Sequence, residues 1–223
     1  MRIVFRYDSF SAEPRNTLNA VRKMVLDSGL PAAPAKVNSH WPRLAYGPAP
    51  AQGQRAEREY LDIYLQELCC VAQVQERLQS VAPEGLTILE VKRVPSSLPC
   101  VQNLATAARY RITGDFASLN HSGRKWEAFI HSANACVQLR AENGMTFTLD
   151  VKPYVLDYTW HTSNDLTCTL TRVQEKWLRP EWLVAAWLGI EVPAGGEPFE
   201  LAGISFTRQY LLWCDSQGEW HPL

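Results

Sequence analysis

The sequence predicts an α+β fold made of two tandem units with the element order βαββαβ. Short segments of alternating apolar and polar residues predict strands with one buried face. Segments with apolar residues at i, i+3 and i+7 predict amphipathic helices. The two kinds of segment follow one another in the same order over residues 1–98 and 106–223. Sequence identity between the halves is not evident, so the repeat is one of element order.

The first unit begins with an alternating strand over residues 2–7 and a helix that starts near Pro14 and stops at Gly29, which favours a left-handed helix end. Residues 30–42 contain three prolines and form a loop too long for a simple connector, so we expect a functional element there. A short strand over 43–46 follows.

The next strand spans 59–65 and has two different faces. Its apolar face carries Leu61, Ile63 and Leu65, and its expected polar aromatic outer face carries Tyr60, Asp62 and Tyr64. An amphipathic helix over 71–81 and a strand over 86–94 complete the first unit.

The second unit follows a connector at 94–105. Its predicted elements are a strand at 109–113, a helix at 126–133, a hairpin at 137–149, a strand at 166–171, a helix from Arg179 to Ile190 and a strand at 199–213. In the hairpin, a three-residue loop ending at Gly144 keeps the apolar residues on one face and pairs Leu139 with Phe147. With one extra strand, this order is that of the ferredoxin-like fold, with antiparallel sheets and helices packed on one face.

Lys152-Pro153 interrupts the strand-forming segment 147–160. The apolar residues are odd-numbered before it and even-numbered after it, which indicates a bulge or a bend, because proline cannot donate to a strand ladder. A bend would aim Asp150, Lys152 and Tyr154 at a common region, toward the cleft between the units. A simple bulge would send Tyr154 to the opposite face, and a structural salt bridge is the other interpretation.

Composition and charge exclude several classes of protein. The net charge of −1 supplies no general field for polyanions, and the local basic group of Arg109, Arg111, Arg124 and Lys125 is loose. The first residues alternate in polarity, and nowhere do about 18 apolar residues run unbroken. We therefore expect a cytoplasmic protein with no membrane partner, for which a nucleic acid is a less favoured ligand but not an excluded one.

The usual catalytic and cofactor motifs are absent. The chain has no phosphate-binding loop, dinucleotide fingerprint, nucleophile elbow, zinc peptidase motif or cluster-binding C-x-x-x-C-x-x-C. The six cysteines include no C-x-x-C pair, and the five histidines lack ligand spacing. We predict no cofactor, no metal and no catalytic residue in this chain.

The loop segment Asn38-Ser-His-Trp-Pro-Arg43 is the densest group of recognition side chains. It offers an imidazole, an indole and a guanidinium within four residues, suited to stacking, hydrogen bonding and anion binding. The alternative is a loop anchored by Trp41 in the core.

Several segments resemble the radical-SAM-linked protein family, a bacterial domain of unknown function encoded beside, or fused to, radical S-adenosylmethionine (SAM) proteins that often carry a cobalamin-binding-type domain. The matching segments are SGLP (28–31), N-x-H-x-P-R (38–43) with LAYGPA, EREYLDIYL (57–65), APEGL (82–86), ARYRI (108–112), LDVKPYVLD (149–157) and RPEWLVAAWLG (179–189). These segments contain the binding candidates Asn38, His40, Arg43, Tyr46, Tyr60, Asp62, Asp150, Lys152, Tyr154 and Arg179.

The chain also departs from the family pattern. Members carry Ser-His-Leu-Asp at the start of the first helix, where this sequence has Glu13-Pro-Arg-Asn16. Trp41 resembles an insertion between the loop histidine and proline. These departures favour a specialised or non-catalytic relative.

Two functions follow as hypotheses. The resemblance implies an accessory or substrate-binding subunit that works with a radical SAM enzyme encoded nearby and helps to hold its substrate. The exposed aromatic candidates for the interface are Tyr60, Tyr64, Trp182 and Trp213. The alternative is an enzyme that modifies RNA or a small molecule in the cleft between the units, with Asp150 as nucleophile or base.

Overall fold

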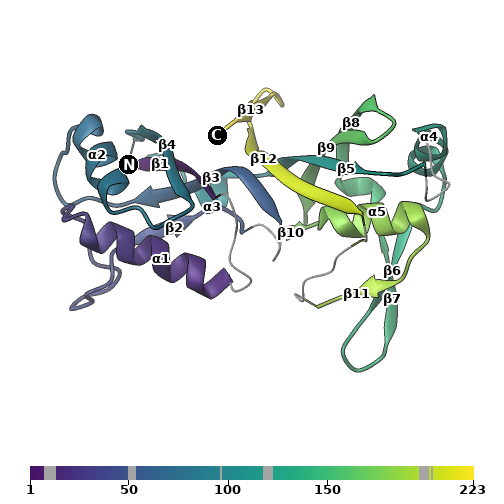
Figure 1. Ribbon diagram of the computed structural model, residues 1–223, viewed down its shortest axis with the longest axis horizontal. Coiled ribbons are helices and arrows are strands. Elements are labelled where there is room, and N and C mark those ends of the chain that lie inside the picture. The colour runs from purple at the N-terminus through teal and green to yellow at the C-terminus, as the bar shows by residue number, and fades with distance from the viewer. Residues whose placement is uncertain (8–13, 50–53, 96, 118–122, 196–200, 202) are drawn as a thin grey trace. The chain divides into compact units, whose positions relative to one another are not determined.

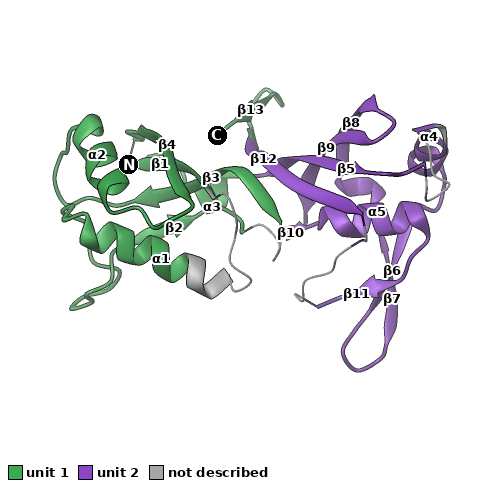
Figure 2. Ribbon diagram, viewed as in Figure 1, with its two compact units in different colours: residues 1–105, 213–223 green, residues 106–212 purple. Residues whose placement is uncertain are grey.

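The computed structural model describes residues 1–7, 14–49, 54–95, 97–117, 123–195, 201 and 203–223, without the side chains of residues 14–17 and 124. The chain divides into two compact units (Figures 1 and 2), formed by Met1–Ala105 with Trp213–Leu223 and by Thr106–Leu212. The sequence predicts a second unit that includes all of 106–223, whereas the structure places the last eleven residues, 213–223, in the first unit.

The first unit contains an antiparallel sheet. The elements of the first unit are β1 (Arg2–Tyr7), α1 (Pro14–Asp27), β2 (Leu44–Tyr46), β3 (Arg55–Ile63), α2 (Val71–Ser80), β4 (Leu86–Lys92) and α3 (Val101–Leu104). Strand β13 (Trp220–Pro222) also lies in the first unit. The strands lie in the order β2-β3-β1-β4, and each is antiparallel to its neighbours. The predicted strands and the two long helices are confirmed, while the one-turn helix α3 replaces part of the predicted connector.

Both long helices of the first unit contribute to one apolar core. The core side chains come from β1, β3 and β4 on the sheet, represented by Ile3 and Leu61, and from both helices, represented by Val25 and Leu78. Burial of such side chains is the main favourable contribution to folding. The i, i+3, i+4 and i+7 pattern of each helix therefore reflects the face that covers the sheet.

The second unit has two sheets. Its elements are β5 (Ala107–Gly114), α4 (Gly123–His131), β6 (Cys136–Arg140), β7 (Thr146–Asp150), the 3-10 turn η1 (Lys152–Tyr154), β8 (Val155–Thr162), β9 (Asp165–Val173), β10 (Lys176–Trp177), α5 (Pro180–Leu188), β11 (Val192–Pro193) and β12 (Ile204–Cys214). In the larger sheet β8, β9, β5 and β12 lie in that order, antiparallel, with β10 also on β9. The smaller sheet has the order β11-β6-β7, and β11 is parallel to β6.

The β6–β7 hairpin has the predicted register. Leu139 pairs with Phe147 and Val137 with Leu149, and Gly144 has a positive φ of 81° in the loop. A left-handed residue in a three-residue hairpin loop favours glycine. The apolar face is only partly covered, since Val137 and Leu139 are buried but Phe147 is 49 % exposed.

The interruption at Lys152-Pro153 is a turn of 3-10 helix that separates β7 from β8. Pro153 lies inside the turn, where the backbone N–H of Tyr154 donates to the oxygen of Val151 at 3.2 Å. Proline is tolerated in a first helical turn because no donor is needed at that position. The sequence predicted either a bulge or a bend at this position, and the structure confirms the bend.

The fold is a mixed α+β fold with mostly antiparallel sheets and, in the described part of the chain, the five helices α1–α5. Among the residues that the structure describes, no helix combines the length and the apolar character that a membrane crossing requires. None of the six cysteines, all of which are described, forms a disulfide.

Candidate binding surface of the first unit

A pocket of about 410 Å³ opens at one end of the first unit, where the ends of β3 and β4 meet the segment that leads to α3. Its apolar wall consists of Tyr64, Leu65, Leu68, Val94, Pro95 and Leu98. Leu68 is 86 % exposed and Leu98 is 38 % exposed. Exposed leucines beside a concave surface are typical of a binding site rather than of a finished core.

Asp62, which lines the pocket, belongs to a buried ion pair. Asp62 accepts two hydrogen bonds from Arg2, at 2.8 and 3.0 Å, and a third from the backbone N–H of Val101 at 2.7 Å. Arg2 also donates to the oxygen of Pro99 at 3.4 Å. These bonds fasten the segment around Pro99 and Val101 to the sheet, so the pocket has a fixed wall.

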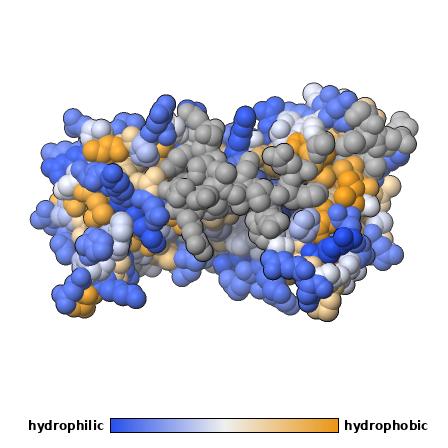
Figure 3. Space-filling model, turned by 60° about the horizontal axis from the view of Figure 1, so that its bottom comes forward, coloured by the Kyte–Doolittle hydropathy of each residue, from blue (hydrophilic) through white to orange (hydrophobic). Residues whose placement is uncertain are grey.

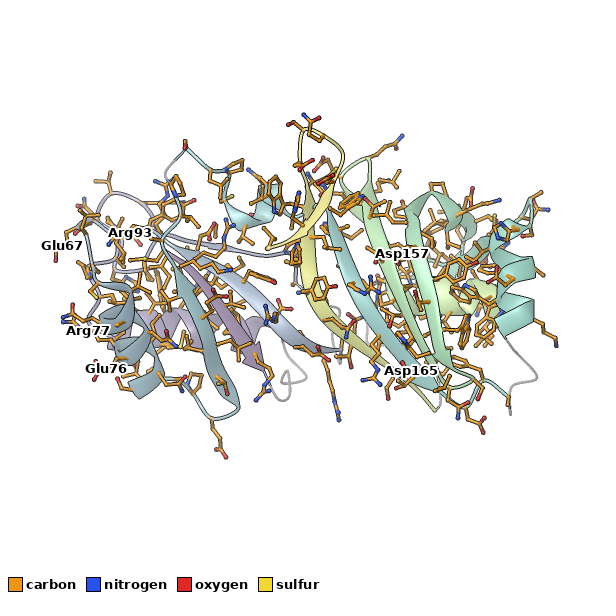
Figure 4. All side chains as sticks on the ribbon, turned by 90° about the horizontal axis from the view of Figure 1, so that it is seen from above. Glu67, Glu76, Arg77, Arg93, Asp157 and Asp165 are labelled. Carbon is orange, nitrogen blue, oxygen red and sulfur yellow. The ribbon has the colours of Figure 1, made fainter. Side chains whose placement is uncertain are left out.

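The rim of the pocket carries charges and thiols. Arg93 and Glu67, labelled in Figure 4, lie at the same end of the first unit and line the pocket with Cys69 and Cys100. Arg93 donates to the backbone oxygen of Cys69 at 3.0 Å and so links β4 to the segment before α2. The Met1 amine donates to the oxygen of Ile63, and burial lowers the pKa of this amine. The pocket therefore has an apolar wall and a polar end.

The proline-rich loop is held against the residues that follow β3. Ala33 donates to the oxygen of Tyr64 at 2.7 Å, and Ala32 pairs with Leu65. The guanidinium of Arg43 lies 4.3 Å from the centre of the Tyr64 ring, a cation–π contact. The loop and the pocket thus share one stretch of chain.

The loop candidates form two groups in the structure. The rings of His40 and Trp41 are in contact at 4.7 Å, and Trp41 is 40 % exposed, so Trp41 does not anchor the loop in the core. Asn38 has a positive φ of 63° in the turn of the loop, a conformation that asparagine adopts more readily than most residues. Neighbouring Val37 is 90 % exposed. Arg43 does not join the His40–Trp41 pair, because its guanidinium stacks on the Tyr64 ring.

The expected polar outer face of β3 is wrong for two of its three residues. Tyr60 is 1 % exposed and Asp62 is 5 % exposed, whereas Tyr64 is half-buried. The chain from Pro99 to α3 lies against this side, as the bond from Val101 to Asp62 shows. A period of two indicates opposite faces but does not show what covers the polar one. Tyr60 is accordingly no exposed interface residue.

Tyr46 lies on the edge strand β2, where it pairs with Leu61 of β3. The side chain is half-buried, and burial raises the pKa of its hydroxyl. Tyr46 therefore belongs with the sheet of the first unit and not with the exposed loop.

The candidates of the second unit have local partners. Asp150 accepts a hydrogen bond from the backbone N–H of Lys152 at 3.0 Å, and the Lys152 ammonium donates to the oxygen of Ser132 at 2.9 Å. Both residues are exposed, whereas Tyr154 is buried. The three side chains therefore do not present one common polar surface. Their orientation toward the other unit stays a prediction.

Arg179 precedes helix α5. Its guanidinium donates to the oxygen of Gly195 at 3.0 Å, and it lies 3.8 Å from the carboxylate of Glu181, which is buried. The guanidinium is 5.8 Å from the Trp182 ring. These contacts connect the start of α5 with the chain after β11, so Arg179 has a structural role in the second unit.

Arg109 and Arg111 of the loose basic group are ion-paired. Arg111 donates three hydrogen bonds to Asp165, the shortest at 2.7 Å, and Arg109 lies 3.6 Å from Asp157. Figure 4 labels both aspartates on the strands of the second unit. The side chain of Arg124 lies outside the described residues. Ion pairing reduces the positive charge that a phosphate backbone would meet.

Sequence reasoning missed one group of potential metal ligands. Asp215, Glu219 and His221 place one ligand atom each within 4.8 Å of one another. Asp215 accepts backbone N–H groups from Gln217 and Glu219, and its second oxygen lies 2.7 Å from His221. The His221 hydrogen bond, followed by the backbone bonds, lowers the pKa of Asp215. These bonds stabilise the turn before β13 and account for the arrangement without an ion.

The pocket itself was also missed. Its signals were faint: an apolar Leu68 outside the strand pattern, and the apolar residues of the proline-containing connector, such as Leu98. Neither residue has a periodic neighbour that would mark it as part of a site.

Comparison with known proteins identifies the family of the chain. Residues 15–180 match the model of an uncharacterized protein family conserved in bacteria, DUF2344. The match covers well over half of the 223 residues, and the chain belongs to this family. No curated protein matches the sequence.

Proposed function

We propose that this protein is a non-catalytic accessory subunit that docks on a radical SAM enzyme and helps to hold the substrate of that enzyme. The observation that carries the proposal is the pocket of the first unit, with its exposed leucines and its fixed wall. The identity of the partner rests on the motif resemblance alone, and a cobalamin-dependent partner is the form that the resemblance suggests.

The charged groups of the first unit support a binding role over a catalytic one. The Asp62 carboxylate accepts three hydrogen bonds that hold the wall of the pocket. A general base needs a carboxylate oxygen within reach of a substrate proton. A residue whose bonds fasten two chain segments is instead suited to preorganise a binding surface, because the surface then loses little freedom on association.

The apolar residues define where the partner would dock. Leu68 and Leu98 line the pocket. Val37 and Trp41 are further exposed apolar residues, on the loop that is tied to Tyr64. On the face that Figure 3 draws, hydrophobic residues interrupt an otherwise hydrophilic surface at several places. We propose that an apolar segment of the partner, with an acidic group beside Arg93, fills the pocket.

We also propose that both units are ferredoxin-like. The orders β2-β3-β1-β4 and β8-β9-β5-β12, with antiparallel neighbours throughout, support this fold in each unit. In the second unit the β6–β7 hairpin, between α4 and β8, and β11, between α5 and β12, would then be two insertions that together form a sheet of their own. A ferredoxin-like unit leaves sheet ends and connecting loops free to bind, which suits an accessory subunit.

Co-purification tests the docking proposal. The tagged full chain should retain the radical SAM protein encoded nearby, and Leu68→Asp should lower the affinity at least about tenfold, the loss expected for a central interface residue. Leu156→Asp is the matched control, because Leu156 is 41 % exposed on β8 and lies outside the pocket. A wild-type chain that never associates with that protein, or a Leu68→Asp variant that binds normally, would overturn the proposal.

A further inference from the structure

The sheets of this protein differ in how their edge strands are protected. Proteins shield exposed edges by short length, charge or irregular pairing, since an open edge can pair with another chain. In the described part of the chain β2, β10, β11 and β13 have two or three residues. Strand β4 carries Glu90 and Lys92, and β8 carries Asp157 and two shifts of register.

Strand β7 has none of these protections before its last residue. It runs over five residues, Thr146–Asp150, and Asp150 is its single charge. Its apolar side includes Phe147, which is 49 % exposed, and the preceding Met145 is 64 % exposed. Within the described chain β7 pairs with β6 alone, at the edge of the smaller sheet. It is therefore an open and largely uncharged edge.

The hydrogen-bond pattern shows which backbone groups are open. Ala141 donates to the oxygen of Met145 at one end of the hairpin, and Val151 donates to the oxygen of Ala135 at the other. In an antiparallel ladder, bonded residues alternate along each strand. Phe147 thus faces β6 with its backbone groups, and the N–H and C=O groups of Thr146, Thr148 and Asp150 point to the open side.

We propose that β7 is a homodimer interface, at which the β7 strand of a second copy pairs antiparallel with it about a two-fold axis through Thr148. In this register Thr148 pairs with itself and Thr146 pairs with Asp150, which gives about six backbone hydrogen bonds. Phe147 then lies beside Leu149 of the second copy in the closely spaced, non-bonded position. Each apolar residue therefore meets an apolar residue.

Charge favours a second copy as the occupant. The two Asp150 side chains fall at opposite ends of the paired strands, four residues apart along the axis, or about 14 Å. This separation exceeds the screening length of about 10 Å at 0.1 M salt. No like charges lie opposite each other, so the strand is complementary to itself in pattern and in charge.

Analytical ultracentrifugation of the full chain, from about 1 to 100 µM, tests this inference. The wild-type protein should sediment as a dimer of the 25.2 kDa chain at the higher concentrations. Thr148→Pro removes the outward N–H at the axis in both copies, so the dissociation constant should rise at least about tenfold. Phe147→Lys should have a similar effect through charge on the open edge.

Leu89→Lys is the matched control, because Leu89 is 37 % exposed on the charged edge strand β4 and should leave the dimer intact. Circular dichroism establishes whether each variant is folded. If Thr148→Pro does not fold, the Phe147→Lys variant tests the dimer by itself, because replacing a half-exposed side chain should leave the fold intact. A wild-type monomer at every concentration, or a folded Phe147→Lys variant that dimerises as tightly as wild type, overturns the inference.

Discussion

The two units each contain an arginine–aspartate pair, joined by two hydrogen bonds in the first unit and by three in the second, and the pairs differ in burial. In the first unit the side chains of Arg2 and Asp62 are only 5 % and 8 % exposed. In the second, Arg111 is 50 % exposed and Asp165 is 15 % exposed. The bond lengths are nearly the same, at 2.8 and 2.7 Å. Geometry alone therefore does not distinguish them.

The difference teaches that burial decides what such a pair does. Breaking a buried pair leaves a charge without water or partner, which is strongly destabilising. An exposed pair is screened by solvent and contributes little. The Arg2–Asp62 pair also holds the wall of the pocket through Val101, whereas Arg111–Asp165 joins neighbouring strands β5 and β9.

The largest expected effect comes from breaking the buried pair. Asp62→Ala should lower the free energy of unfolding by about 3–5 kcal/mol, because the Arg2 guanidinium would remain buried without its carboxylate. Urea denaturation followed by circular dichroism measures this change. A loss below about 1 kcal/mol would show that water reaches Arg2 and that the pair is not buried in solution.

A double replacement separates the pair from the wall that it holds. In Arg2→Met with Asp62→Leu no buried charge remains, so stability should recover relative to Asp62→Ala. The Val101 N–H still loses its acceptor, and we expect a remaining deficit of about 1–3 kcal/mol against wild type. The same urea titration gives both numbers. Full recovery of the wild-type free energy of unfolding would mean that the hydrogen bond from Val101 to Asp62 contributes nothing to stability.

The exposed pair should respond weakly and with a defined pH dependence. Asp165→Ala should cost about 0.5–1 kcal/mol at pH 7. The hydrogen bond from Arg111 lowers the pKa of Asp165. The folded pKa lies below the unfolded one, so the contribution is present above about pH 4 and disappears as pH falls through the folded pKa. Urea titrations of both proteins between pH 7 and 3 should show the gap closing, while a gap that widens toward acid contradicts this origin.

The smallest effect is expected at Lys152. Its ammonium donates to the oxygen of Ser132 at the exposed turn after β7. Lys152→Ala should therefore change the free energy of unfolding by less than about 0.5 kcal/mol. Thermal unfolding of the variant beside wild type is a sufficient measurement. A larger loss of unfolding free energy would show that the turn stabilises the fold more than its exposure indicates.

Local patterns in the sequence predicted most of the secondary structure. The register of the hairpin followed from apolar residues such as Leu139 and Phe147 together with Gly144, because a shift of one residue would exchange its faces. The turn at Pro153 followed from the change of phase across it, because proline lacks a donor. Both signals lie within a few residues of the feature that they predict.

The candidate site was predicted less well because its parts are distant in the sequence. Asp62 was chosen as an exposed binding residue, but its partners Arg2 and Val101 lie 60 and 39 residues away. His40 and Trp41 were grouped with Arg43 because all three are close in the chain, and the structure brings only the first two rings together. The pocket requires β3, β4 and the segment before α3 to meet, and no periodicity encodes that meeting.

The sequence by itself determined the type and order of most strands, helices and turns, because those depend on side-chain period, glycine and proline over short distances. It did not determine all of their bounds, since β3 begins at Arg55 and α3 lies in the predicted connector. Membership of the DUF2344 family also follows from the sequence alone. Only the tertiary structure decided that Asp62 is buried and Asp165 is not, and that the edge of β7 is open. Burial depends on which distant segments cover a residue, and a strand's alternation is the same whether its polar face meets water or another segment of the chain.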